Sequence, residues 1–263
     1  MRRRSLITAG AWAAAVVGGP RLGGCTVPPL LSPAEPVDLL LVLAVDVSRS
    51  VDADEALLQR EGYRAALVDP AVLRAVRAGP QGAIGVAYVE WAGREFQRLL
   101  VPWTRIAEQA DATAWAARLA DPVPAPTVEA TTSDALLFGT SIARGIAFSV
   151  MTLAEAPWDA ARRVIDVSGD GPDNSGFWTG GVEAARDRAV REGITVNGLA
   201  IEGDQEAPDD LWPGASLADY YRASVVGGPG AFVIEADGIS AFREAIRRKL
   251  VREIAGARIP AAT

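Results

Sequence analysis

The feature that most constrains the fold is a continuous apolar run, VDLLLVLAV, at residues 37–45, which stops at Asp46. A run of this length without alternation is typical of a strand buried on both faces of a parallel sheet. We expect further strands at residues 83–91, 163–167, 194–201 and 231–236, separated by helical stretches at residues 52–68, 106–119, 133–154, 180–192, 217–226 and 239–254. Residues 97–101 follow the second strand after a short turn, which predicts an antiparallel hairpin partner. Strands that alternate with helices predict an α/β fold, with a mostly parallel central sheet and one antiparallel edge strand.

Three scarce residue types exclude several kinds of catalysis. The 263 residues include no histidine, one cysteine (Cys25) and one lysine (Lys249). These counts exclude histidine-dependent nucleophilic triads, histidine-ligated zinc or haem, and an intramolecular disulfide. Leu250 follows the lysine, which excludes the Gly-Lys-Ser/Thr sequence of a phosphate-binding P-loop. The formal net charge of −7 argues against nucleic acid as a partner and suits cations or partners with basic patches.

The amino-terminal segment has the pattern of an export signal. Residues 1–24 combine three arginines after Met1, a short alanine-rich apolar stretch and small residues, which together predict a secretory signal peptide. The Arg3-Arg4 pair resembles a twin-arginine signal. The apolar stretch is too short for a lasting transmembrane helix. The signal predicts an exported protein of the periplasm or cell envelope.

The only cysteine of the chain follows this segment directly. The sequence LGGC at residues 22–25 resembles a bacterial lipobox, so Cys25 is a predicted lipidation site and the membrane would be reached through that lipid anchor. In the alternative interpretation the signal is an ordinary one and Cys25 is incidental. Four prolines in residues 26–36 suit an extended tether. We therefore expect a signal peptide at residues 1–24, a proline-rich tether at residues 25–36, one domain at residues 37–256 and a tail at residues 257–263.

Oxygen-bearing side chains follow the predicted strands at three places. Asp46, Ser48 and Ser50 come directly after the first strand, Thr140 lies in a loop before a helix, and Asp170 follows the strand at residues 163–167. Ligands of open α/β sheets bind at the carboxyl ends of the strands, where these loops can converge. Carboxylate and hydroxyl oxygens without imidazole or thiolate select a hard divalent cation, with Mg²⁺ preferred and Ca²⁺ or Mn²⁺ as alternatives. The three segments therefore predict a metal site.

These motifs resemble the metal-ion-dependent adhesion site of the von Willebrand factor A (vWA) domain, which consists of Asp-x-Ser-x-Ser, a threonine and an aspartate. The match covers almost all of residues 37–256 and fills all five positions, and it implies a three-layer, Rossmann-like vWA fold. The stretch at residues 167–176 and the segment from Tyr220-Tyr221 to Phe232 are more similar to the bacterial DUF1194 group of this superfamily, which has no agreed function. In such sites few direct ligands are charged, so the cation stays able to accept a carboxylate from a partner protein. The resemblance implies metal-bridged adhesion or scaffolding with no enzymatic step.

Neighbouring residues are weaker candidates for partner binding. They comprise Arg49, between the two serines, and four residues that follow Asp170, namely Asp173, Asn174, Phe177 and Trp178. Exposed aromatic side chains are good partner anchors, although Phe177 and Trp178 equally suit core packing. A purely structural interpretation also stays open, in which Asp46 caps the next turn and Asp170 serves a turn.

Three other functions compete with adhesion. A hydrolase of the haloacid dehalogenase type also places an aspartate after its first strand, but it needs a second aspartate where this chain has Ser48, and a supporting lysine. A periplasmic small-ligand-binding domain is the second alternative. The third is a scaffold in which the metal holds the fold together.

Overall fold

The computed structural model describes residues 35–48, 53–120, 139–175, 181–202 and 214–256. Within these ranges the chain forms one six-stranded sheet in the order β3-β2-β1-β4-β5-β6. Its strands are β1 (Val37–Asp46), β2 (Ile84–Trp91), β3 (Gln97–Ile106), β4 (Ala160–Gly169), β5 (Thr195–Glu202) and β6 (Val233–Asp237). Every neighbouring pair is parallel except β2 and β3, which form an antiparallel hairpin at the sheet edge.

Strand β1 is buried on both faces because it lies in the middle of the sheet between β2 and β4. Its side chains alternate between two hydrophobic cores, as the pleat of a strand requires. Leu39, Leu41 and Leu43 belong to one core, and Leu40 and Val42 belong to the other. The continuous apolar run therefore serves two helical layers at once, which makes the molecule a three-layer structure.

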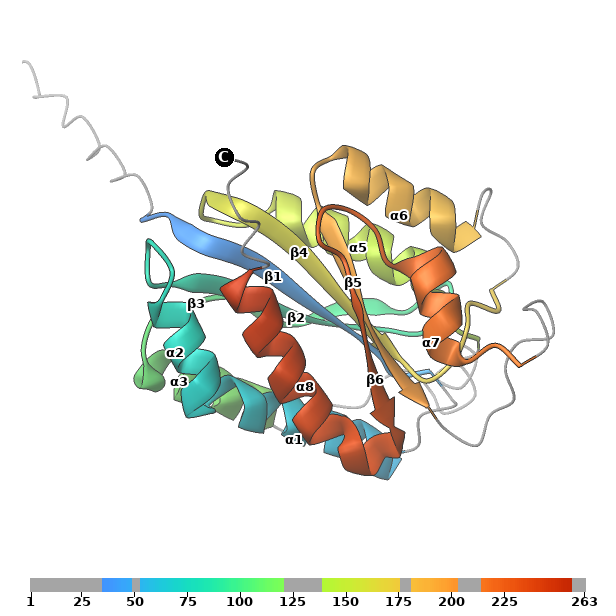
Figure 1. Cartoon of the computed structure of the whole chain (residues 1–263), viewed down its shortest axis with the longest axis horizontal. Coiled ribbons are helices and arrows are strands. Elements are labelled where there is room, and N and C mark those ends of the chain that lie inside the picture. Colours follow the sequence, from blue (N-terminus) through green and yellow to red (C-terminus); the bar gives the residue numbers. More distant parts are fainter. Residues whose placement is uncertain (1–34, 49–52, 121–138, 176–180, 203–213, 257–263) are drawn as a thin grey trace, which may run out of the picture. The chain divides into compact units, whose positions relative to one another are not determined.

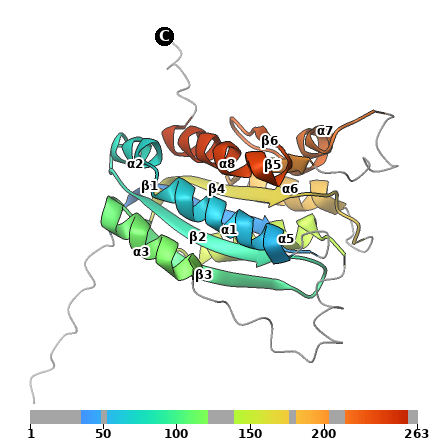
Figure 2. The same cartoon turned by 90° about the horizontal axis from the view of Figure 1, so that it is seen from below.

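Helices cover both faces of the sheet (Figures 1 and 2). The core around Leu41 is closed by α1 (Ala53–Leu67), α2 (Pro70–Arg77), α3 (Gln109–Ala120) and α8 (Gly238–Ala255). The core around Val42 is closed by α5 (Ile142–Ala154), α6 (Gly181–Arg191), α7 (Leu217–Tyr220) and the π-helix η1 (Tyr221–Val225). The predicted α/β class, with a mostly parallel sheet and one antiparallel edge strand, is confirmed. None of the helices in the described ranges has the length and apolar character needed to span a bilayer.

Two elements differ from the sequence-based expectation. Helix α2 was not predicted, although it has a clear start signal: Pro70 is its first residue and the Asp69 side chain accepts a hydrogen bond from the Ala71 amide at 2.7 Å. The prediction of a helix from residue 106 was wrong at its start, because Ile106 is the last residue of β3 and pairs with Ile84. A buried apolar residue at the junction fits either element, so periodicity alone does not assign it.

Candidate metal site at the carboxyl ends of β1 and β4

The predicted motifs meet where β1 and β4 end. Val45 of β1 pairs with Ser168 of β4, so Asp46 and the segment before Asp170 leave the sheet side by side. From β1 the chain continues to β2 on one side of it and later to β4 on the other. The carboxyl ends of the strands at such a change of direction are the usual ligand position of open α/β sheets.

Asp46 is a fully buried carboxylate with one unsatisfied oxygen. Its Oδ1 accepts a hydrogen bond from the Ser48 amide at 2.8 Å, whereas Oδ2 has no hydrogen-bond partner among the described residues. Burial, followed by the negative charges of Asp170 and Asp173, raises the pKa of Asp46 to about 8. The carboxylates of Asp46 and Asp170 therefore repel each other.

Glu90 provides an internal comparison one strand away, because it is the second-last residue of β2 and pairs with Val45. It is also fully buried, and it accepts paired hydrogen bonds from Arg60 at 2.9 and 2.6 Å and from Arg98 at 2.8 and 2.6 Å. No described residue forms an ion pair of this kind with Asp46. Among the described residues, the fold thus provides cationic partners for Glu90 and none for Asp46.

Two hydroxyl groups lie together at the same edge. The Thr140 hydroxyl donates to Oγ of Ser48 at 3.2 Å, and both residues are buried. Asn174 holds Thr140 through two hydrogen bonds. Its side-chain Oδ1 accepts from the Thr140 backbone N–H at 2.7 Å, and its backbone N–H donates to the Thr140 carbonyl at 3.0 Å. Asn174, predicted as a partner-binding residue, therefore has a defined role in positioning the threonine loop.

Asp173 likewise makes contacts inside the protein. One oxygen accepts from the Ala143 amide in the first turn of α5 at 3.3 Å, and the other accepts from the Ser175 hydroxyl at 2.7 Å. Its amide donates to the Tyr220 hydroxyl at 3.2 Å. Asp173 thus joins α5 to the loop after β4, and its predicted contact with a partner stays a prediction.

Tyr221 lies beside the site and was not predicted as part of it. Its hydroxyl is buried and has no hydrogen-bond partner among the described residues. A Cβ atom at Gly169 would lie 2.7 Å from this hydroxyl and 3.2 Å from Oδ2 of Asp46, so only glycine leaves room for both groups. Burial, followed by the charge of Asp46, raises the pKa of Tyr221 well above its usual value. The signal in the sequence is the Tyr220-Tyr221 pair, which carries part of the DUF1194 resemblance but does not by itself indicate a position beside Asp46.

The donor set fits a hard cation. Asp46 offers an unsatisfied buried oxygen, Ser48 and Thr140 offer hydroxyl oxygens, and Asp170 adds a nearby negative charge. Within the described ranges, no three histidine, cysteine, aspartate or glutamate side chains form a group that could hold a metal ion. The predicted residues Ser50, Arg49, Phe177, Trp178 and Cys25 lie outside the described residues.

Solved structures similar to this chain share its fold. A pilus adhesin, SpaC from Lactobacillus rhamnosus GG, is 14% identical with a TM-score of 0.55, over 85% of this chain and 30% of the adhesin. A von Willebrand factor type A protein from Catenulispora acidiphila is 14% identical with a TM-score of 0.53, over 83% of this chain and 43% of that protein. Proximal thread matrix protein 1 from mussel byssus, with a zinc-occupied adhesion-site motif, is 13% identical with a TM-score of 0.50, over 82% of this chain and 46% of that protein. The chain spans less than half the length of each of these structures.

No curated protein matches the chain. Residues 36–258 match the family described as "Protein of unknown function (DUF1194)". That match covers most of the sequence and all of the described elements. The chain therefore belongs to the DUF1194 family, and its domain has a vWA-like fold.

Proposed function

We propose that this domain binds a divalent cation, Mg²⁺ in the first instance, and uses it to hold a carboxylate of a partner protein. Asp46, Ser48, Ser50, Thr140 and Asp170 would hold the cation. In this proposal the protein is exported, anchored to the cell envelope through a lipid at Cys25, and acts as an adhesion or scaffold module rather than an enzyme. The signal peptide, tether, domain and tail keep the boundaries given by the sequence.

The observation that carries the proposal is the contrast between Asp46 and Glu90. Both carboxylates are fully buried, but only Glu90 is paired with arginines. Leaving a buried charge unpaired is costly, and a bound cation would remove that cost at Asp46. The adjacent hydroxyls of Ser48 and Thr140 supply neutral ligands, which leave most of the charge of the cation uncompensated.

The protein's own residues would position the ligands in three ways. Asn174 fixes the threonine loop, Asp173 anchors that loop's helix, and Gly169 allows Asp46 and Tyr221 to approach each other. When bound, the cation would supply a coordination position that accepts a carboxylate oxygen. Charged side chains around it would then select the partner.

Two observations support a non-enzymatic role. Lys249, the only lysine, is buried in α8 and forms ion pairs with Asp166 and Glu253, so it does not assist Asp46 as a haloacid dehalogenase would require. One protein of the same fold is described as a pilus adhesin, and another carries zinc at its adhesion-site motif. These relatives support surface adhesion with a metal for this chain.

Titration calorimetry with Mg²⁺ and Mn²⁺ tests the metal site. We expect Thr140→Val, which replaces the hydroxyl with a methyl group, to weaken binding about tenfold, equivalent to about 1.4 kcal/mol. Ser141→Ala is the matched control, because Ser141 is the adjacent buried hydroxyl but bonds to Ser175 instead. Equal affinity of the Thr140→Val variant and the wild type would contradict the assignment.

The partner is tested separately. We expect an affinity pull-down from envelope extract to recover a protein in Mg²⁺ that is lost in EDTA and with Asp46→Ala. Replacing the acidic residues at the partner's contact surface should then abolish the interaction. Recovery that is equal in Mg²⁺ and EDTA would rule out metal-bridged binding while leaving the calorimetric result for the metal intact.

A further inference from the structure

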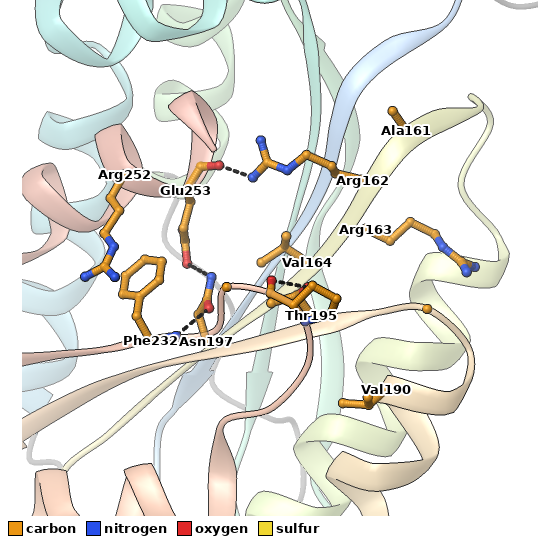
Figure 3. Close-up of a pocket in the computed structure, with 13 residues that line it drawn as sticks. Ala161, Arg162, Arg163, Val164, Val190, Thr195, Asn197, Phe232, Arg252 and Glu253 are labelled. Carbon is orange, nitrogen blue, oxygen red and sulfur yellow. Dashed lines mark hydrogen bonds between the residues drawn. The ribbon is translucent and has the colours of Figure 1, made fainter. Parts of the chain in front are cut away.

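A cavity of about 460 Å³ lies at the amino ends of the parallel strands, whereas Asp46 lies at a carboxyl end. Figure 3 shows the residues that line the cavity. It is formed by the amino ends of β4 and β5, the end of α8 and the loop before β6. Its size is in the usual range of small-molecule sites. None of the residues predicted from the sequence to form the metal site lines it.

Three arginines line the cavity, and none of them forms an ion pair with a carboxylate of the described residues. Arg162 donates to the backbone carbonyls of Glu253 and, at 3.2 Å, Ile254. Arg163 donates to the carbonyl of Glu192. The guanidinium of Arg252 lies over the ring of Phe232 at 3.8 Å from its centre. Figure 3 shows Arg162 directed toward Glu253, with Arg252 and Phe232 together on the far side of Glu253.

Glu253 is the only acidic residue among those that line the cavity, and one of its oxygens accepts hydrogen bonds from neighbouring side chains. Oε1 of Glu253 accepts from Lys249 at 2.5 Å and from Asn197 at 3.0 Å, and Lys249 also forms an ion pair with Asp166. With one lysine and two carboxylates, this buried cluster carries one formal negative charge, and Oε2 of Glu253 has no hydrogen-bond partner among the described residues. The three arginines that line the cavity outnumber its one carboxylate, so the lining is net positive in a chain whose net charge is −7. Burial, the largest effect, lowers the pKa of Arg162, whereas the negative charges of Glu253 and Asp38 act in the opposite direction.

The rest of the lining is apolar. Val164 is buried at the base of the cavity, and Val190, Pro229 and Phe232 contribute further carbon surface. Guanidinium groups prefer carboxylate and phosphate oxygens, with which they form paired hydrogen bonds. A ligand that satisfies both parts has an anionic head and a compact apolar body.

We propose that this cavity binds a small organic anion, whose carboxylate or phosphate group is held by arginines of the net positive lining while its apolar body packs against Val164 and Phe232. This cavity is separate from the proposed metal site at the carboxyl ends of β1 and β4, and binding of the anion does not require the metal ion. It gives the domain a second ligand, of a different chemical class from the partner carboxylate.

Calorimetry on the purified protein in EDTA tests the proposal with four probes. Phenylacetate and phenyl phosphate present the two anionic groups on the same body, 2-phenylacetamide is the neutral analogue, and inorganic phosphate lacks the body. We expect at least one aromatic anion to bind with a Kd of about 1 mM or below. The amide and inorganic phosphate should bind at least tenfold more weakly, and the stronger aromatic anion identifies the preferred head group.

Two double variants make the test specific. Arg163→Gln/Arg252→Gln removes two of the guanidinium groups and keeps Arg162, which caps α8; we expect at least tenfold weaker anion binding. Arg74→Gln/Arg77→Gln changes the charge equally on the exposed surface of α2 and should leave binding unchanged. The proposal is overturned if neither aromatic anion binds, if the amide binds equally well, or if both double variants weaken binding alike.

Discussion

Asp46 and Glu90 are two buried carboxylates at the ends of neighbouring parallel strands, and the protein treats them differently. Glu90 receives two arginines, Arg60 from α1 and Arg98 from β3, each through a pair of hydrogen bonds. Asp46 receives one backbone amide and faces the charge of Asp170. Glu90 is therefore part of the folded structure's own charge balance, whereas Asp46 has no ion-pair partner among the described residues, as the proposed cation site requires.

A third buried carboxylate is intermediate. Asp166 of β4 shares Lys249 with Glu253, so two acids have one cation between them. Burial, followed by the charge of Glu253, raises the pKa of Asp166 to about 7. Among the described residues, Glu90 has two cationic partners, Asp166 shares one and Asp46 has none. The following predictions test this series.

The largest effect is expected when the arginines of Glu90 are removed. Arg60→Met/Arg98→Met leaves a fully buried carboxylate unpaired, which should lower the free energy of unfolding by about 3 kcal/mol. Urea denaturation measures the loss. Adding Glu90→Gln to the double variant should recover much of it, and an unchanged midpoint in the double variant would show that Glu90 needs no cation.

A smaller effect is expected from the pH dependence of Asp166. Its pKa in the folded protein lies above the value of 3.8 for the free group, so the folded state holds the extra proton between those values. Its contribution to stability is complete below about pH 4 and is lost as the pH rises to about 7. We expect the urea midpoint of Asp166→Asn to lack this part of the wild-type decline. Parallel curves for the two proteins would place the decline elsewhere.

Replacing Asp46 should change the free energy of unfolding in the opposite direction from removing the arginines that pair with Glu90. In EDTA, Asp46→Asn keeps an acceptor for the Ser48 amide and removes a carboxyl group whose ionised form is opposed by burial and by Asp170, so we expect a gain of about 1 kcal/mol in the free energy of unfolding. Mg²⁺ should stabilise the wild type and leave the variant unchanged. Thermal unfolding with and without Mg²⁺ measures both. A loss of stability in EDTA would instead favour a structural capping role for Asp46.

The apolar runs and the order of the motifs predicted the sheet and brought Asp46, Ser48, Thr140 and Asp170 to one edge. Runs that must be buried on both faces leave few alternative arrangements, so these elements follow from local pattern. The sequence did not predict the arginines around Glu90, because Arg60 and Arg98 reach it from separate elements. Pairing of this kind depends on distances between elements, which no local pattern contains.

The same limit applies to the arginine-lined cavity. In the sequence, Arg163 begins a predicted strand and Arg162 directly precedes it, whereas Arg252 belongs to the last predicted helix. Only the crossing of β4 by the end of α8 brings them around one space. The cavity therefore had no signal in the sequence beyond the abundance of arginine.

The smallest effect is expected at Tyr221, where the contrast between Asp46 and Glu90 can be sharpened. The Tyr221 hydroxyl is buried and has no hydrogen-bond partner among the described residues. Tyr221→Phe therefore removes a polar group without breaking a hydrogen bond to them. We expect the free energy of unfolding in EDTA to change by less than about 1 kcal/mol. The proximity of this hydroxyl to Oδ2 of Asp46, imposed by Gly169, should appear instead as a small change in Mg²⁺ affinity. A large loss of stability in EDTA would mean that the hydroxyl already has a partner, so the space between Tyr221 and Asp46 would not be reserved for a ligand.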